Sequence, residues 1–163
     1  MKRSFLAVLL FASALDAPVV LAQDQGQMNM APSEVARPLW KNLSYNGRAL
    51  KGQSFVGAWF EDSTFSEAML KGADFSSSLL RRIKMKASNL IGANFSGAIL
   101  EDVDFSNSNL TKACFIGARL VRVKFTNANI SGAAFTGAKF EGGGAELQNI
   151  ATTAEYGPKT CPK

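Results

Sequence analysis

The sequence predicts an all-β solenoid of about five coils, and three regularities support this prediction. A large apolar residue recurs every five positions from Leu50 to Phe140 without interruption. Steps of five scatter residues around a helix and alternate between the faces of a strand, so neither element explains this period. A small residue lies two positions before most of these apolar residues, a glycine often lies two positions after them, and charges alternate in sign every twenty residues.

The apolar residues form an unbroken series of nineteen centres, one in each five-residue unit. They are Leu50, Phe55, Phe60, Phe65, Leu70, Phe75, Leu80, Met85, Leu90, Phe95, Leu100, Phe105, Leu110, Phe115, Leu120, Phe125, Ile130, Phe135 and Phe140. If every unit turns its centre toward a shared interior, the chain must bend by the same amount after each unit. Glycine two residues after the centre eases such bends, and Ala or Ser two residues before it leaves room for a narrow axis.

The charged residues indicate how many units complete one coil. The columns at a spacing of twenty are Asp62, Arg82, Asp102 and Arg122; Glu61, Arg81 and Glu101; and Lys84, Asp104 and Lys124. Stacking opposite charges avoids the penalty of like charges on adjacent strands. Residues twenty apart are therefore expected to be stacked neighbours, with four units per coil. Each exposed pair contributes only about 0–1 kcal/mol, so the columns indicate register more than stability.

Units such as "ANFSG", "ADFSS", "SNLTK" and "ARLVR" resemble those of the pentapeptide-repeat family, whose unit is Ala-Asp/Asn-Leu-x-x. The resemblance covers residues 48–142 and implies a right-handed quadrilateral β-helix. Short terminal caps are expected because a stacked tube exposes backbone edges at both ends. Members of this family mostly lack an assigned activity, so the resemblance supplies no substrate and no cofactor.

The two ends differ from the repeat. Residues 1–22 have the three parts of a signal peptide: Lys2 and Arg3, a short apolar run, and a small-residue cleavage site ending at Ala22. The alternative is a buried N-terminal helix. No later run is long enough to span a bilayer, so we expect a periplasmic or secreted protein without a membrane span after signal removal. Residues 23–47 are predicted to be a flexible N-terminal segment and N-cap, and residues 143–163 a C-terminal cap or tail.

The two cysteines, Cys114 and Cys161, suit an oxidising compartment in which a pair can form a disulfide. The sequence cannot show whether they approach closely enough, so a disulfide and two free thiols both remain open.

Two surface features are candidate binding sites. Trp59, Leu79 and Ile99 lie twenty apart and point outward, as either a partner site or the docking strip for a terminal segment. The second feature is a candidate basic patch of Arg81, Arg82, Lys84, Lys86, Arg119, Arg122 and Lys124. It could contact polyanions or be an ordinary solvated face. Intervening carboxylates at Glu101, Asp102 and Asp104 favour the solvated face.

The sequence contains no His and no recognisable nucleophile–base set, phosphate loop or metal-ligand spacing. It therefore predicts an exported, non-enzymatic, rigid protein-interaction or structural module, without cofactor or metal and with an unknown protein partner. Some relatives imitate DNA and bind DNA gyrase, but the export signal and 12 Lys+Arg against 8 Asp+Glu in residues 48–142 argue against this alternative. Nucleic-acid binding is not expected either, because the carboxylates between the basic residues cancel much of their attraction to phosphate. An envelope polyanion binder is a third hypothesis. Homodimerisation through the C-terminal segment is implied by relatives alone.

Overall fold

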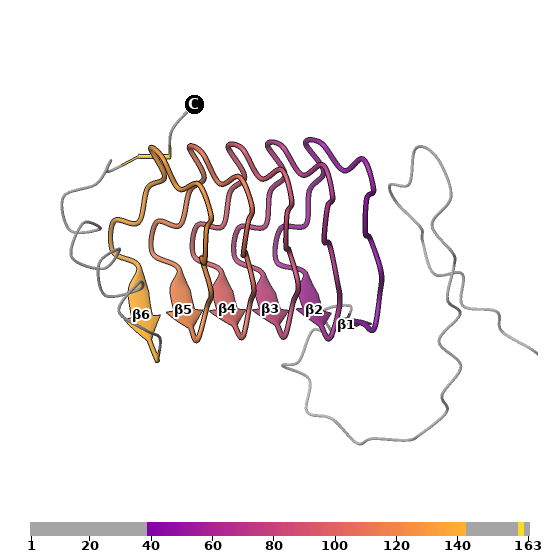
Figure 1. Ribbon diagram of the computed structural model, residues 1–163. Helices are drawn as coiled ribbons and strands as arrows, with labels where there is room; N and C mark the ends of the chain where they lie inside the picture. Colours follow the sequence, from indigo (N-terminus) through magenta and orange to yellow (C-terminus); the bar gives the residue numbers. More distant parts are fainter. Residues whose placement is uncertain (1–38, 143–159, 162–163) are drawn as a thin grey trace, which may run out of the picture. The chain divides into compact units, whose positions relative to one another are not determined.

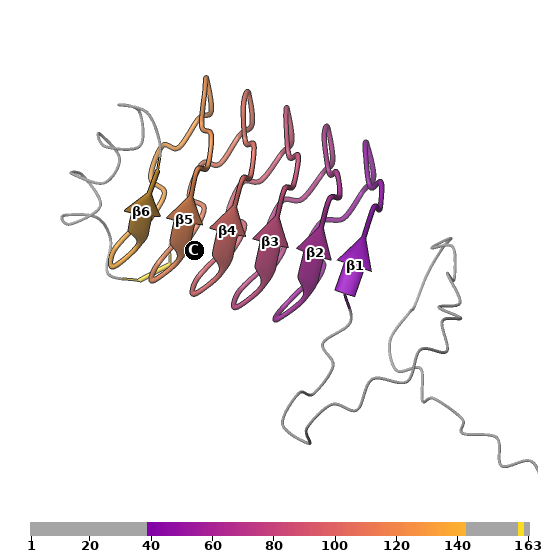
Figure 2. The same cartoon turned by 90° about the horizontal axis from the view of Figure 1, so that it is seen from below.

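A computed structural model describes residues 39–142 and 160–161, and residues 39–142 form a continuous β-solenoid of about five turns (Figure 1). Its strands are β1 (Leu39–Lys41), β2 (Trp59–Glu61), β3 (Leu79–Arg81), β4 (Ile99–Glu101), β5 (Arg119–Val121) and β6 (Lys139–Glu141). They form one parallel sheet in sequential order, so each strand pairs with the strand of the next coil (Figure 2). The prediction of an all-β solenoid with residues twenty apart as neighbours is confirmed.

Each coil has four sides, because three further segments pair between coils at five-residue intervals. Single parallel bridges join Ser44 to Thr64, Ala49 to Met69 and Ser54 to Asp74, and the same pattern repeats along the axis. We call the side that carries β1–β6 the strand side. The sides that carry Thr64, Met69 and Asp74 are the second, third and fourth sides. The four-sided coil agrees with the quadrilateral β-helix that the resemblance implied.

The chain bends at a left-handed residue at the end of every side. From Asn42 to Gly142, each fifth residue has a positive φ, and these corners comprise ten glycines and eleven other residues. Gly72 has a φ of +66°, which glycine adopts without steric cost. Asp62 has a φ of 51°, a conformation that costs a residue with a Cβ atom about 1 kcal/mol or more. The predicted role of the glycine position as the turn is confirmed.

The interior consists of the residues at the centre of each unit. On the fourth side, the rings of Phe75, Phe95 and Phe115 stack with centroids 5.1 and 4.9 Å apart. Phe95 also meets Phe105 of the opposite, second side edge-to-face at 5.5 Å. Leucines occupy most of the remaining two sides, so the ten-residue Phe/Leu alternation of the sequence places the phenylalanines on opposite walls.

The solenoid begins earlier than the sequence predicted. Leu39, assigned to the N-cap, pairs with Trp59, and the ring of Tyr45 stacks on Phe65 at 4.8 Å. Trp40 and Tyr45 continue the five-residue series, but Leu43 occupies the position expected for a small residue, which hid the first coil. The predicted signal peptide, residues 23–38, and residues 143–159 and 162–163 of the predicted C-terminal cap lie outside the described residues.

Candidate interaction surfaces

The strand side carries a column of apolar side chains. Strand pairing places Leu39 beside Trp59, Trp59 beside Leu79, and Leu79 beside Ile99. Leu39 is 48% exposed and Ile99 38% exposed, while Trp59 and Leu79 are half-buried. The structure thus aligns the three residues singled out from the sequence and adds Leu39, which was missed because the first coil was not recognised. We call these four residues the apolar column.

A charged column runs beside the apolar column on the same side of the solenoid. In β2, β3 and β4 the middle residue is buried, and the residues before and after it face outward. The outward residue after the centre is Lys41, Glu61, Arg81 and Glu101 in β1 to β4. The strand side therefore presents an apolar row next to a row of alternating charge.

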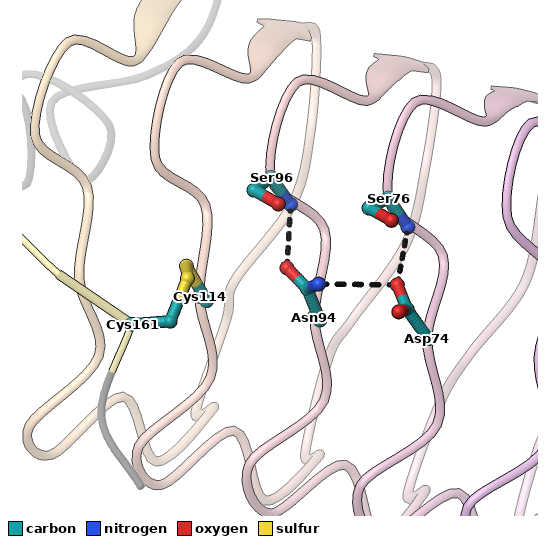
Figure 3. Close-up of a disulfide and its surroundings, with 6 residues drawn as sticks. All are labelled: Asp74, Ser76, Asn94, Ser96, Cys114 and Cys161. Carbon is teal, nitrogen blue, oxygen red and sulfur yellow. Dashed lines mark hydrogen bonds between the residues drawn. A yellow bond between two sulfur atoms is a disulfide. The ribbon is translucent and has the colours of Figure 1, made fainter.

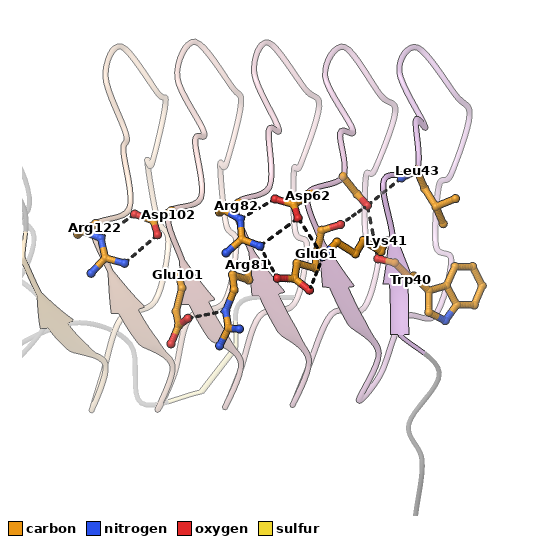
Figure 4. Close-up of polar contacts among 11 residues, drawn as sticks. Trp40, Lys41, Leu43, Glu61, Asp62, Arg81, Arg82, Glu101, Asp102 and Arg122 are labelled. Atoms are coloured by element: carbon orange, nitrogen blue, oxygen red, sulfur yellow. Dashed lines mark hydrogen bonds and ion pairs between the residues drawn. The ribbon is translucent and has the colours of Figure 1, made fainter. Parts of the chain in front are cut away.

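Opposite charges on adjacent coils form ion pairs along this row and along the neighbouring corner (Figure 4). Arg81 Nε donates to Glu101 Oε2 at 2.9 Å. Arg82 Nε donates to Asp62 Oδ1 at 2.5 Å, and its Nη2 also contacts the Glu61 carboxylate. The sequence prediction that these residues are stacked neighbours is borne out by the geometry.

Three of the five remaining members of the candidate basic patch are also paired with carboxylates. Lys86 Nζ lies 3.2 Å from Asp104 Oδ2, and Arg119 Nη2 lies 2.6 Å from Glu141 Oε2. Arg122 makes two hydrogen bonds of 2.7 Å with Asp102. Lys84 and Lys124 are exposed and pair through the backbone with Asp104 between them, without a carboxylate within 4.0 Å in the described part of the chain. Most of the predicted patch is therefore neutralised locally.

The guanidinium groups hold the carboxylates in their charged form. Hydrogen bonds from Arg82 lower the pKa of Glu61 and Asp62, and a hydrogen bond from Arg122 lowers the pKa of Asp102. A carboxylate with a lowered pKa is a weak base near neutral pH. These acidic residues are accordingly held as partners of the arginines on adjacent coils.

The two cysteines form a disulfide on the fourth side (Figure 3). Cys114 follows Asp74 and Asn94 in the same column. In this column Asp74 Oδ1 accepts hydrogen bonds from Asn94 Nδ2 at 3.1 Å and from the backbone N–H of Ser76 at 2.9 Å. Cys114 and Cys161 have Cα atoms 5.2 Å apart, within the usual range for a disulfide. The structure therefore selects the disulfide from the two alternatives that the sequence left open.

The third side offers a contrast to the apolar column. Met69 is 54% exposed, but the next residues in its column are Asn89, Asn109 and Asn129. Met69 is the one large apolar residue among Ala49, Met69, Asn89, Asn109 and Asn129 of its column, whereas the strand side carries large apolar residues on four consecutive coils. Single exposed apolar residues are common on protein surfaces, and contiguous ones more often mark contacts.

Within residues 39–142 and 160–161, no three His, Cys, Asp or Glu side chains gather closely enough to hold a metal ion. The same described residues include no helix with the length and apolar character needed to cross a membrane.

A four-sided parallel solenoid built from five-residue units defines a class of repeat proteins. The model of the family described as "Pentapeptide repeats" matches eight copies in this chain, at residues 49–82, 88–127 and 115–142. These ranges cover more than half of the sequence, so the chain belongs to the pentapeptide-repeat family.

Solved structures of this family are similar to the chain. A pentapeptide-repeat protein of the Arabidopsis thaliana thylakoid lumen is 28% identical, covering 66% of this chain and 75% of its own, with a TM-score of 0.49. Rfr23 of the cyanobacterium Cyanothece 51142 is 19% identical, covering 64% and 82%, with a TM-score of 0.45. HetL of Nostoc sp. strain PCC 7120, involved in heterocyst differentiation regulation, is 24% identical, covering 63% and 41%, with a TM-score of 0.40. No individually curated protein matches the chain.

Proposed function

We propose that this protein is an exported, non-enzymatic repeat protein that presents its strand side as a rigid surface for protein contacts. The observation that carries the proposal is the apolar column, four consecutive apolar residues in register on the outside of one sheet. Partly exposed apolar side chains gain free energy when a partner covers them, at about 25 cal/mol per Å².

The surface is preorganised for binding because both the backbone and the interior are fixed. Backbone hydrogen bonds join each coil to the next on every side, for example Leu79 N–H to the Ala58 carbonyl at 2.9 Å. The fully buried side chains of Phe60, Leu80 and Leu100 fill the interior directly behind the strands. Binding of a partner therefore orders few groups of this protein, so the entropic cost on this side of the interface is small.

Two observations support export. The first 22 residues have the composition of a signal peptide. The disulfide between Cys114 and Cys161 is of a kind that persists in oxidising compartments such as the periplasm or the extracellular medium. These features lead us to propose a location outside the cytoplasm.

The charge arrangement weighs against both alternative functions. Imitation of DNA requires a continuous acidic surface, whereas the carboxylates here alternate with arginines such as Arg82 and Arg122. Binding of a polyanion requires free cations, whereas carboxylates pair with five of the seven residues of the candidate basic patch. An enzymatic role is likewise disfavoured, because the sequence contains no His and no recognisable nucleophile–base set.

Site-specific photo-crosslinking in the native cells tests this function. Leu79 is replaced by benzoylphenylalanine, and in a matched control Met69 on the third side is replaced in the same way. We expect crosslinked protein from position 79 and little or none from position 69. Equal labelling at the two positions, or none at position 79, contradicts the proposal.

A further inference from the structure

We propose that the partner of the strand side is a second copy of this chain. The two copies pack strand side to strand side with antiparallel solenoid axes, related by a two-fold axis that runs along the strands between β2 and β3. This inference rests on the proposed function, because it names the occupant of the same surface.

The apolar column matches itself under this rotation. The half-turn places Leu39 opposite Ile99 of the second copy and Trp59 opposite Leu79, so all four coils of the column find an apolar counterpart. The column ends where Arg119 and then Lys139 follow in the same register. The apolar column is therefore limited to β1–β4. A two-fold axis that matches the whole column with itself must pass through its middle, between β2 and β3.

The charged column is complementary to itself under the same rotation. From β1 to β4 it reads Lys41, Glu61, Arg81 and Glu101, alternately positive and negative. The half-turn brings Lys41 opposite Glu101 and Glu61 opposite Arg81, so every charge faces an opposite charge. A shift of one coil places the axis on a strand and brings like charges together, which costs free energy. The alternating charges of the charged column therefore specify both the partner and the register between the two copies.

The other face-to-face arrangement lacks this complementarity. A two-fold axis along the solenoid axis would place the apolar column against the charged column, with Leu39 opposite Lys41. Burying a charge against an apolar side chain without a partner is unfavourable. Only the axis along the strands satisfies both rows at once.

The size of the surface sets the expected strength of association. Four coils extend about 19 Å along the axis, and three-residue strands extend about 10 Å across it. A contact of these dimensions covers about 190 Å² on each copy, well below the about 800 Å² per partner of a standard interface, so we expect a weak association with a dissociation constant of about 0.1–1 mM.

Sedimentation of the purified protein with its disulfide intact tests the dimer at concentrations up to about 2 mM, above the expected dissociation constant. We expect a concentration-dependent monomer–dimer equilibrium that Ile99→Arg weakens at least tenfold. Arginine is tolerated at this position of a coil, because Arg119 occupies it in β5. The control Met69→Arg on the third side leaves the equilibrium unchanged. A monomer at all concentrations, or a dimer indifferent to Ile99→Arg, overturns the proposal.

Cysteine crosslinking tests the register. Leu39→Cys and Ile99→Cys proteins are mixed and oxidised, and we expect a disulfide-linked dimer that contains one chain of each variant. Each variant alone gives no such dimer, because three coils of about 4.8 Å separate Leu39 from the Leu39 of the second copy. The control mixture of Ala49→Cys and Asn109→Cys, from the same two coils on the third side, stays uncrosslinked. Equal crosslinking in the control, or efficient crosslinking of Leu39→Cys with itself, contradicts the arrangement.

The two proposals fail in different ways. If the protein is monomeric in solution but position 79 crosslinks to a different protein in cells, the dimer is refuted and the proposed function remains supported. If position 79 crosslinks to nothing and the protein is monomeric, both are refuted.

Discussion

Replacement of Phe95 by Ala is expected to destabilise the solenoid severely. Phe95 is 0% exposed and stacks between Phe75 and Phe115, with interplanar angles of 5° and 7°. Truncation of a buried Phe costs about 3–5 kcal/mol through lost burial and the cavity that remains. Each aromatic pair contributes about 0.5–1.5 kcal/mol beyond burial, so the loss of two stacks and the contact with Phe105 places the effect near the upper end of that range. Domains of this size are stable by only about 5–15 kcal/mol.

Urea unfolding followed by far-UV circular dichroism measures this loss. Each coil of a solenoid contacts only its neighbours, so a defect in the middle also reduces the cooperativity of unfolding and lowers the m-value. The control is Phe140→Ala in the last described coil, where Phe140 is half-buried and contacts Phe135 at 5.9 Å. We expect a smaller loss of about 1–2 kcal/mol and an unchanged m-value. Equal losses in the two variants would refute the account of a continuous aromatic stack.

Three further predictions concern the corners, the charges and the disulfide. Gly72→Ala is expected to lower the free energy of unfolding by about 1–2 kcal/mol, because its φ is +66° and an added Cβ meets no atom within 4 Å. Ala87→Gly, at a φ of 53°, has no such cost, and calorimetry that finds the two substitutions equally destabilising contradicts this reasoning. Arg82 lowers the pKa of Asp62 in the folded state, so this ion pair stabilises the fold at neutral pH. The stabilisation is lost as the pH falls below about 4, because Asp62 then becomes protonated. Arg82→Gln should therefore show a shallower decline in stability on acidification, and an unchanged acid profile counts against the ion pair. Reduction of the disulfide, which spans 47 residues, should lower the free energy of unfolding by about 4 kcal/mol in the chain-entropy model, and an unaltered urea midpoint after reduction argues against its formation.

The coil geometry could be predicted from the sequence because two periods are superimposed in it. The five-residue period marks the sides, and the alternation of Asp62, Arg82 and Asp102 marks the twenty-residue coil. Both periods follow from contacts between residues at a fixed separation, so a single sequence is sufficient to reveal them. The stacked pairs in the structure lie where these periods placed them.

The first coil could not be predicted, because end coils depart from the repeat. Trp40 is 38% exposed and packs against Phe60 at 5.4 Å from one direction only. With no described coil before it, a terminal coil is not required to keep a small residue beside each centre, and Leu43 occupies that position. Terminal repeats are atypical in solenoids for this reason. The consequence was that Leu39 was missing from the predicted partner surface.

The disulfide lay beyond sequence reasoning for a different reason. Cys114 follows the repeat, so its place on the fourth side was predictable, but Cys161 lies after the last repeat. No periodicity relates the two residues across a separation of 47. Their approach depends on the path of the chain between them, which composition and spacing do not determine.

The central claim of an exported solenoid with a tethered C-terminal segment can be tested by one measurement on the native protein. Cells are fractionated, free thiols are alkylated without reduction, and the intact mass of the protein in each fraction is determined. We predict a chain that begins at Gln23, is found outside the cytoplasm and carries no alkylated cysteine, because Cys114 and Cys161 are bonded to each other. A full-length cytoplasmic chain with both cysteines alkylated would contradict the account.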